Sequence, residues 1–280
     1  MKPFVKWAGG KRQLLPTIKQ YVPKKFNRYF EPFIGGGALF FNLGRTGSYI
    51  SDINKELINT YQVVSNGKLI FELIDKLKVH KKANCSEYYY QIRDLDKNSD
   101  FQNLSEVDRA ARFIYLNKTC FNGIQRENSK GHNNVPFGDN PNPNILDDMT
   151  LIECYRLLSK TEICHAGFET IVDKAQENDF VYFDPPYVPL PEKLSFTKYS
   201  QNDFSMEDHE KLKKTIDTLH NKGVYVMISN SYSDITEKLY ADYKKIPVDA
   251  TRMLNSKGNN RGAIKEMLVI TYDEISRGEI

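Results

Sequence analysis

The sequence predicts a doubly wound α/β core that carries an inserted, mostly helical subdomain. A short apolar strand, 28–34, runs directly into three glycines, 35–37, and an apolar helical stretch follows them. A second short strand, 48–51, then ends at Asp52 and leads into another helical pattern. Such alternation is typical of a parallel sheet with helices on both faces, and ligands on that sheet bind beyond the carboxyl ends of its strands.

The second half of the chain returns to this pattern. Residues 179–183 and 224–228 are nearly continuous apolar runs, as expected of parallel strands covered on both faces. A helix with Leu212 and Leu219 on one face precedes the second run, and 267–272 supply a final strand. The sheet therefore draws its strands from both ends of the chain.

The middle of the chain has a different character. A helical pattern over 107–116 gives way to a polar stretch, 117–148, that is rich in Asn, Gly and Pro and too long for a simple connection. We therefore expect residues 66–150 to form the inserted subdomain, and residues 1–65 and 151–280 to form the core.

Composition is that of an ordinary globular chain. Of the 280 residues, 40% are hydrophobic and 27% are charged. No apolar run is long enough to span a membrane, and the N-terminus does not resemble a signal peptide. The four cysteines form no C-x-x-C pair, so we predict neither a disulfide framework nor a metal site. We expect a soluble, cytoplasmic protein with no membrane partner.

The net charge of +3 is unevenly distributed. Residues 1–30 contain eight basic side chains and no acidic one. A second basic stretch consists of Lys244, Lys245, Arg252, Lys257, Arg261 and Lys265. Such clusters can face the phosphates of a nucleic acid, but either cluster alone is more often a solvated surface.

The glycine turn is a candidate ligand site. Gly35 and Gly37 allow a ligand to approach the backbone closely, and Asp52 ends the next strand, where its carboxylate can accept ribose hydroxyls. The turn matches G-x-G-x-x-G only in its first two glycines, because Phe40 holds the third position. A nucleoside without a pyrophosphate therefore fits better than a dinucleotide. An ordinary tight turn remains the alternative.

The segment Asp184-Pro185-Pro186-Tyr187 is the most informative feature. Its prolines hold an extended, donor-free backbone immediately after a strand, which fixes the Asp184 carboxylate relative to the Pro185 carbonyl. If both oxygens accept hydrogen bonds from the amino group of adenine, the nitrogen lone pair is freed to attack a methyl group directly. Tyr187 can stack on the extruded base. The alternative is a proline-stiffened turn with a buried capping aspartate.

Several segments together resemble a known family, the Dam-type DNA adenine N6-methyltransferases, most closely the Dpn-type GATC-modifying branch. The segments are Lys6-Trp7-Ala8-Gly9-Gly10-Lys11, residues 29–37, Ser51-Asp52-Ile53-Asn54, Asn122-Gly123-Ile124-Gln125-Arg126, Asn134-Val135-Pro136-Phe137-Gly138 and the Asp-Pro-Pro-Tyr segment. Their order resembles the α-type arrangement, in which a target-recognition subdomain separates the cofactor half from the catalytic half.

This resemblance implies a Rossmann-like core that depends on S-adenosylmethionine. It implies that Lys11 pairs with the methionine carboxylate of the cofactor and that Asp52 holds its ribose. The residues expected to border the cofactor are Trp7, Lys11, Phe33, Gly35, Asp52 and Asp184. Trp7 has an alternative role as a core anchor.

The resemblance also implies a set of contacts with duplex DNA. Base contacts fall on Asn122 and Arg126, Pro136 lies against a thymine methyl group, and Lys6 lies near an outer guanine. Phe121 would fill the space left by the flipped base.

Two positions depart from the pattern of the family. Asp139-Asn140 stands where GATC-modifying enzymes carry a basic residue and a tyrosine, which leaves the readout of the outer base open. Gly167 stands before Phe168 where close relatives have an aspartate, so contacts to the adenine of the cofactor are expected to differ.

The prediction is methyl transfer to adenine N6 in duplex DNA, at GATC, after base flipping and without a covalent intermediate or a metal. We expect a monomer that acts alone or beside a cognate restriction endonuclease. Three alternatives remain: N-methylation of RNA or of a protein amide, a nicotinamide oxidoreductase, and a non-catalytic DNA-binding module.

Overall fold

The computed structural model describes residues 1–123, 126–138, 140–188, 204–251 and 263–273. The chain forms two compact units: unit 1 holds Met1–Gly10 and Ile34–Ala166, and unit 2 holds Lys11–Phe33 and Gly167–Ile280. Each unit combines strands with helices, so the predicted α/β class is confirmed. The compact units divide the chain at other positions than 65/66 and 150/151. Compactness does not test where the recognition subdomain begins and ends, so those boundaries remain a prediction.

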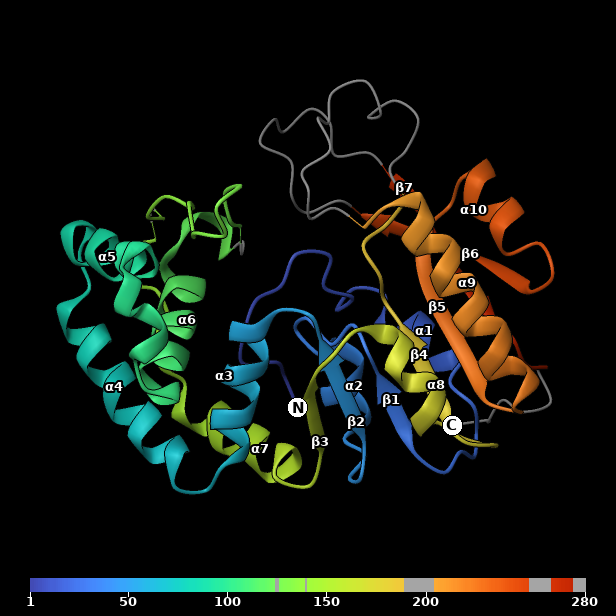
Figure 1. Cartoon of the computed structure of the whole chain (residues 1–280), viewed down its shortest axis with the longest axis horizontal. Coiled ribbons are helices and arrows are strands. Elements are labelled where there is room, and N and C mark those ends of the chain that lie inside the picture. Colours follow the sequence, from blue (N-terminus) through green and yellow to red (C-terminus); the bar gives the residue numbers. More distant parts are fainter. Residues whose placement is uncertain (124–125, 139, 189–203, 252–262, 274–280) are drawn as a thin grey trace. The chain divides into compact units, whose positions relative to one another are not determined.

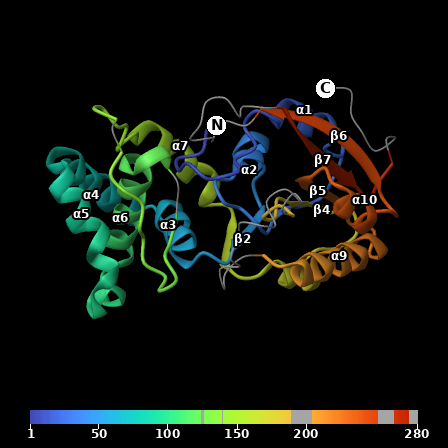
Figure 2. The ribbon, with the colours of Figure 1, turned by 90° about the horizontal axis from the view of Figure 1, so that it is seen from above.

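The described residues of unit 2 form five strands, in the order β1-β4-β5-β7-β6. These are β1 (Tyr29–Glu31), β4 (Phe180–Phe183), β5 (Tyr225–Ser231), β6 (Lys244–Thr251) and β7 (Ala263–Ile270). The strands β1, β4 and β5 are parallel, with Phe183 paired to Ile228. β7 runs antiparallel to β5, so Glu266 pairs with Ser231, and β6 and β7 form an antiparallel ladder that is visible in Figure 2. Asp184 therefore follows the carboxyl end of a central strand.

The helices of unit 2 cover this sheet. They are α1 (Leu15–Gln20), α8 (Ile171–Lys174), α9 (Met206–Asn221) and α10 (Asp234–Leu239), with a 3-10 turn, η4 (Phe168–Thr170). α9 runs along β5 in Figure 1 and buries Leu212 and Leu219, while Ser205 and Asp208 cap its N-terminus reciprocally. All four residues of β4 are buried, as predicted for a strand covered on both faces.

In the part of unit 1 that the structure describes, two parallel strands occur, β2 (Tyr49–Asp52) and β3 (Glu162–His165), with Asp52 paired to His165. Three helices, α2 (Ala38–Leu43), α3 (Lys55–Ser65) and α7 (Asp148–Leu158), belong to the same unit. The Asn54 side chain caps α3 by accepting a hydrogen bond from the Leu57 amide at 2.9 Å, so only Ile53 and Asn54 separate the helix from the end of β2.

The rest of unit 1 is mostly helical, as predicted for residues 66–150. It contains α4 (Leu69–Ala83), α5 (Ser86–Arg93) and α6 (Glu106–Thr119), with the 3-10 turns η1 (Asp94–Lys97), η2 (Ser99–Asn103) and η3 (Phe121–Gly123). α6 packs against α3, α4 and α5, and eleven of its fourteen residues are buried. Arg112 of α6 pairs with Asp96 at 2.8 Å and donates to the Ile92 carbonyl, which ties α6 to the end of α5.

Some predictions fall outside the described residues. These are Ile124 and Gln125 of the segment that resembles the family, the departure at Asp139, and the basic side chains of Arg252, Lys257, Arg261 and Lys265. None of the helices in the described part of the chain has the length and hydrophobicity needed to cross a bilayer.

Candidate active site

Unit 1 brings Trp7, the glycine turn and Asp52 together. Gly35 has a φ of +43°, and a Cβ built on it would lie 2.6 Å from Cδ1 of Trp7. The Gly35 amide donates to Oδ2 of Asp52 at 3.1 Å, and the Tyr61 hydroxyl donates to the Gly35 carbonyl at 3.0 Å. Glycine is therefore required here both for the backbone conformation and for the close approach of the indole ring.

The carboxylate of Asp52 is fixed by main-chain donors. Its Oδ1 accepts a hydrogen bond from the Asn54 amide at 2.9 Å, while Oδ2 accepts from Gly35. Burial raises the pKa of Asp52, and the hydrogen bonds from the backbone oppose this rise by favouring the ionised form. Because each carboxylate oxygen has two lone pairs, the group can still accept hydrogen bonds from a bound nucleoside.

Unit 2 places Lys11 against Asp184. The Nζ atom of Lys11 lies 2.9 Å from Oδ1 of Asp184, and the two side chains are 5% and 21% exposed. Burial raises the pKa of the Asp184 carboxyl, the Lys11 ammonium lowers it, and the negative charge of Glu266 raises it. A carboxylate in this setting is more basic than an exposed aspartate and is held in one orientation.

Tyr187 is held by two of its neighbours. Its hydroxyl donates to Oε2 of Glu266 at 2.6 Å, and Nζ of Lys11 lies 4.6 Å from the centre of its ring. Burial and the charges of Asp184 and Glu266 raise the pKa of Tyr187, so its hydroxyl stays protonated and remains a donor. The plane of the ring is thereby fixed relative to Asp184.

The backbone after the motif is tied to the end of β5. The Val188 amide donates to Oδ1 of Asn230 at 3.2 Å, and the Ser231 hydroxyl donates to the Val188 carbonyl at 2.9 Å. In the motif itself, Pro185 is buried and Pro186 is exposed. The Asp-Pro-Pro-Tyr segment is thus anchored by Lys11 and Glu266 on its side chains and by β5 on its main chain.

Phe33 lies in an aromatic cluster in unit 2. Its ring stacks on Phe168 with centres 5.4 Å apart and meets Phe204 edge-on at 5.7 Å. Phe168 follows the departure at Gly167, where a Cβ would collide with a carboxylate oxygen of Glu169. A carboxylate therefore lies beside Gly167 although it comes from a residue two positions later.

The residues predicted to contact DNA lie in unit 1. The Phe121 amide donates to the Pro136 carbonyl at 2.9 Å, and Phe121 is 47% exposed. Asn122 is exposed and has a φ of +59°, and the adjacent Gly123 has a φ of +64°. A Cβ on Gly123 would collide with Cδ of Lys6, so the Lys6 chain lies against this turn.

Arg126 lies on the other branch of the same loop. Its Nε donates to Oδ1 of Asn134 at 2.7 Å, and its guanidinium is exposed. The branch is anchored to α5, because the Tyr89 hydroxyl donates to the Val135 carbonyl at 2.9 Å. Isolated bridges between Cys120 and Phe137 and between Glu127 and Asn133 complete the loop.

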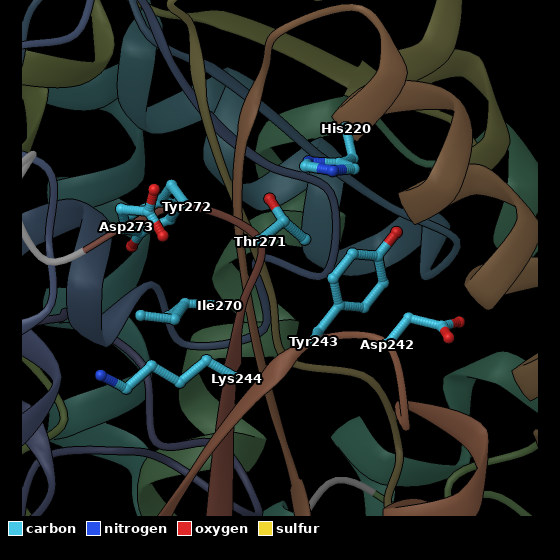
Figure 3. A pocket seen from close by; sticks show the side chains of 8 residues that line it. All are labelled: His220, Asp242, Tyr243, Lys244, Ile270, Thr271, Tyr272 and Asp273. Carbon is cyan, nitrogen blue, oxygen red and sulfur yellow. The ribbon is translucent and has the colours of Figure 1, made fainter.

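A hollow in unit 2 lies away from these groups. It is lined by residues at the start of β6 and just beyond β7, among them Tyr243, Lys244 and Thr271 (Figure 3). Ile270, which also lines it, pairs with Met227 near the start of β5, whereas Glu266 pairs with the last residue of that strand. The hollow is therefore at the opposite end of the strands from Asp184, and no predicted site residue lines it.

Sequence analysis missed three residues of the site: Asn230, Ser231 and Glu266. They lie in β5 and β7 beyond the apolar runs from which these strands were predicted. For Asn230 and Ser231, the available signal was polar side chains that continue a buried strand at its carboxyl end, whereas Glu266 lies within β7 and had no such signal. Among the described residues, no cluster of three or more His, Cys, Asp or Glu side chains is arranged to hold a metal ion.

Comparisons with known proteins show which family and which relatives this chain resembles. The model of the D12 class N6 adenine-specific DNA methyltransferases matches residues 7–254. A Type II methyltransferase of Lactococcus lactis subsp. cremoris, M1.LlaDCHI, is 44% identical over 274 residues, which are 97% of this chain and 96% of that protein. The DNA adenine methylase of Escherichia coli K12 is 33% identical over 273 residues, covering 96% and 95% of the two chains.

A solved structure, that of a precorrin 8W decarboxylase from Methanobacterium thermoautotrophicum, covers 95% of this chain and 91% of its own at 11% identity and a TM-score of 0.33. That likeness carries no argument about fold or function.

Proposed function

The chain belongs to the D12 class N6 adenine-specific DNA methyltransferases, and on that premise we propose that it transfers a methyl group from S-adenosylmethionine to N6 of a flipped adenine in duplex DNA. The observation that carries the proposal is the partly buried carboxylate of Asp184, held by Lys11 at the end of β4. Family membership favours DNA adenine over the RNA, protein-amide and nicotinamide alternatives.

In the proposed mechanism the Asp184 carboxylate and the Pro185 carbonyl accept hydrogen bonds from the adenine amino group. The N6 lone pair would then form the new carbon–nitrogen bond as the methyl carbon–sulfur bond of the donor breaks. S-adenosylhomocysteine would leave with that electron pair, and Asp184 would receive the proton that the nitrogen releases. Its raised pKa suits this role, because a more basic carboxylate is a better proton acceptor. Tyr187, with its ring plane set by Glu266, stacks on the extruded base.

The residues predicted to border the cofactor fit S-adenosylmethionine, which supplies an electrophilic methyl group when bound. The bare Cα of Gly35 and the Asp52 carboxylate offer close approach and acceptors for a ribose. Lys11 has three donors, so it can pair with the methionine carboxylate while keeping Asp184. Phe33 offers an apolar face to the adenine, and we propose that Glu169 supplies the carboxylate that Gly167 lacks.

The proposed DNA contacts are those of Lys6, Phe121, Asn122, Arg126 and Pro136, within a target-recognition subdomain at 66–150. We propose GATC as the target, with the outer base read by residues other than those of the usual pattern, because Asp139 and Asn140 differ from it. The names of the relatives support either a restriction-modification role beside a cognate endonuclease or an independent Dam-like role. We further propose a monomer that acts in the cytoplasm.

The test is methylation by purified protein with radiolabelled S-adenosylmethionine and, in separate reactions, duplex DNA, single-stranded DNA and RNA. We expect label in the duplex, and none with Asp184→Ala. Turnover by Asp184→Ala at the wild-type rate would overturn the mechanism. Single-molecule sequencing of DNA from cells that express the protein then reports the target sequence, and methylated adenines outside GATC would overturn that assignment.

A further inference from the structure

The side chain of Asn117 binds the main chain of Lys6 at two points. The Lys6 amide donates to Oδ1 of Asn117, and Nδ2 of Asn117 donates to the Lys6 carbonyl, both at 2.8 Å. Asn117 lies in the last turn of α6 and is 1% exposed, while the two residues are 111 positions apart in the chain. The main-chain N–H and C=O of Lys6 are thus both satisfied by the buried side-chain amide of Asn117.

The clamped residue adjoins two different parts of the proposed site. Trp7 follows it directly, and the Trp7 ring lies against Gly35 beside Asp52. The aliphatic chain of Lys6 itself lies against Gly123, in the turn that presents Phe121 and Asn122. A shift of the Lys6 backbone would therefore displace a proposed cofactor contact and a proposed DNA contact together.

We infer that Asn117 is a positioning residue that sets Trp7 for the cofactor and Lys6 for DNA through these two hydrogen bonds. The inference rests on the proposed function, since it takes the Trp7 side as the cofactor pocket and the Lys6 side as the DNA interface. Asn117 itself contacts neither ligand in this scheme. Its amide acts through the peptide groups on either side of the Lys6 α-carbon.

The chain offers a matched control in Asn59. This buried asparagine lies in α3 of the same unit, is 6% exposed, and donates to the Glu106 carbonyl at the start of α6 at 3.0 Å. It therefore has the same chemistry and burial as Asn117 and also contacts α6. Because no hydrogen bond of the Asn59 side chain reaches the Lys6–Trp7 segment, Asn59→Ala reports the effect of losing a buried amide in this region.

The experiment measures three quantities for wild type, Asn117→Ala and Asn59→Ala: the Kd for S-adenosylhomocysteine by calorimetry, the Kd for a GATC duplex by fluorescence anisotropy, and the thermal unfolding midpoint. We expect Asn117→Ala to weaken both ligands by about tenfold, as for the loss of one to two net hydrogen bonds, and to raise the KM for S-adenosylmethionine. Asn59→Ala should lower the unfolding midpoint while leaving both Kd values close to those of wild type.

A second variant keeps the test decisive if Asn117→Ala does not fold. Asn117→Asp removes the donor to the Lys6 carbonyl at neutral pH, but a protonated aspartic acid offers one acceptor and one donor as the amide does. Burial beside a carbonyl raises the pKa of that carboxyl. The ratio of variant to wild-type affinity for both ligands should therefore recover as pH falls, whereas Asn117→Ala should show no such recovery.

Two results would overturn the inference: Kd values for Asn117→Ala that match those of Asn59→Ala, or a loss that affects only one ligand. An Asn117→Asp ratio that stays flat with pH would also count against it. A wild-type protein that binds neither ligand would overturn the proposed function itself, and the inference with it.

Discussion

The buried Lys11 and the partly exposed Asp184 form an ion pair with a separation of 2.9 Å between Nζ and Oδ1. The pair holds the carboxylate in place and opposes the effect of burial, which would otherwise favour its neutral form. For the proposed reaction, the position of the Asp184 carboxylate beside the Lys11 ammonium therefore matters as well as its charge.

Asp184→Asn preserves the shape of the side chain and removes its ability to take a proton. We expect the methylation rate to fall by about 10²- to 10⁴-fold, while binding of cofactor and of duplex DNA stays measurable. Single-turnover assays with saturating DNA would report the chemical step. The mechanism fails if the variant methylates DNA at more than a tenth of the wild-type rate, on the order of what one lost hydrogen bond would explain.

Glu266→Gln should move the pH dependence of the reaction. The charge of Glu266 raises the pKa of Asp184, so its removal lowers that pKa and leaves Asp184 ionised in more acidic solution. The acid limb of the kcat profile should therefore shift to lower pH. Tyr187→Phe removes the hydrogen bond to Glu266 but keeps the Glu266 charge, so its acid limb should not move in that direction. Identical profiles for the two variants would contradict the role of the charge.

Gly35→Ala should weaken cofactor binding through a collision with Trp7. The new methyl group would lie 2.6 Å from the indole ring and would stand on a backbone with a φ of +43°. Gly47→Ala is the matched control, because its φ is +71° and no atom lies within 4 Å of its Cβ. Both variants carry about 1–2 kcal/mol of backbone strain, but only Gly35→Ala should raise the Kd for S-adenosylhomocysteine. Equal Kd values for Gly35→Ala and Gly47→Ala would show that Gly35 is needed only for the conformation of the turn and not for cofactor binding.

Arg126→Ala should reduce discrimination between target sequences. A guanidinium that reads a guanine contributes about 1–3 kcal/mol against the wrong base, and the exposed Arg126 donates to the side chain and the carbonyl of Asn134. Lys130→Ala, in the same loop, should weaken binding to all duplexes alike. Competition between GATC and singly substituted duplexes separates these outcomes, and an unchanged ratio for Arg126→Ala would remove it from the readout.

His209→Leu should make the protein more resistant to acid. Both ring nitrogens of His209 are buried without a hydrogen-bond partner in the described part of the chain, and burial lowers its pKa to about 4. Between about pH 6.5 and 4 the imidazole of His209 is protonated in the unfolded chain but not in the folded protein. The free energy of unfolding of the wild type therefore decreases as pH falls through this range. His209→Leu has no titrating group at this position, so it does not show this decrease in the free energy of unfolding. Urea unfolding at pH 7 and pH 5 should show a difference in free energy that grows at pH 5, and a constant difference would rule out this histidine as a cause.

The central strands could be predicted because their residues are apolar on both faces. β4 and the first part of β5 read as buried strands in the sequence, and the structure places them as expected. The edge strands could not. β6 begins with Lys244 and Lys245 and contains Pro247, residues that protect sheet edges, and this stretch was read only as a basic cluster. β3 is largely exposed and has no apolar run.

The site was predictable where one local segment supplies the chemistry. The Asp-Pro-Pro-Tyr motif and the glycine turn reveal themselves by their residue types alone. Glu266 and Asn230 could not be identified in this way, because the role of a single polar residue in a strand can be inferred only once its neighbours on the adjacent strands are known. The clamp between Asn117 and Lys6 joins positions 111 residues apart, and no local pattern indicates it.

Both units are built from discontinuous parts of the chain, so they become complete at different times during synthesis on the ribosome. Unit 1 is complete once Ala166 has emerged, but Lys11–Phe33 belong with residues that follow Gly167. β1 must therefore wait for β4, since the Arg28 amide and its Asp179 acceptor are 151 residues apart. At the usual pace of synthesis that delay lasts roughly 8–30 s. During this time Tyr29 and Phe30 are exposed without their strand partner, so the nascent chain should be most prone to aggregation, and most in need of a chaperone, before Phe180 emerges.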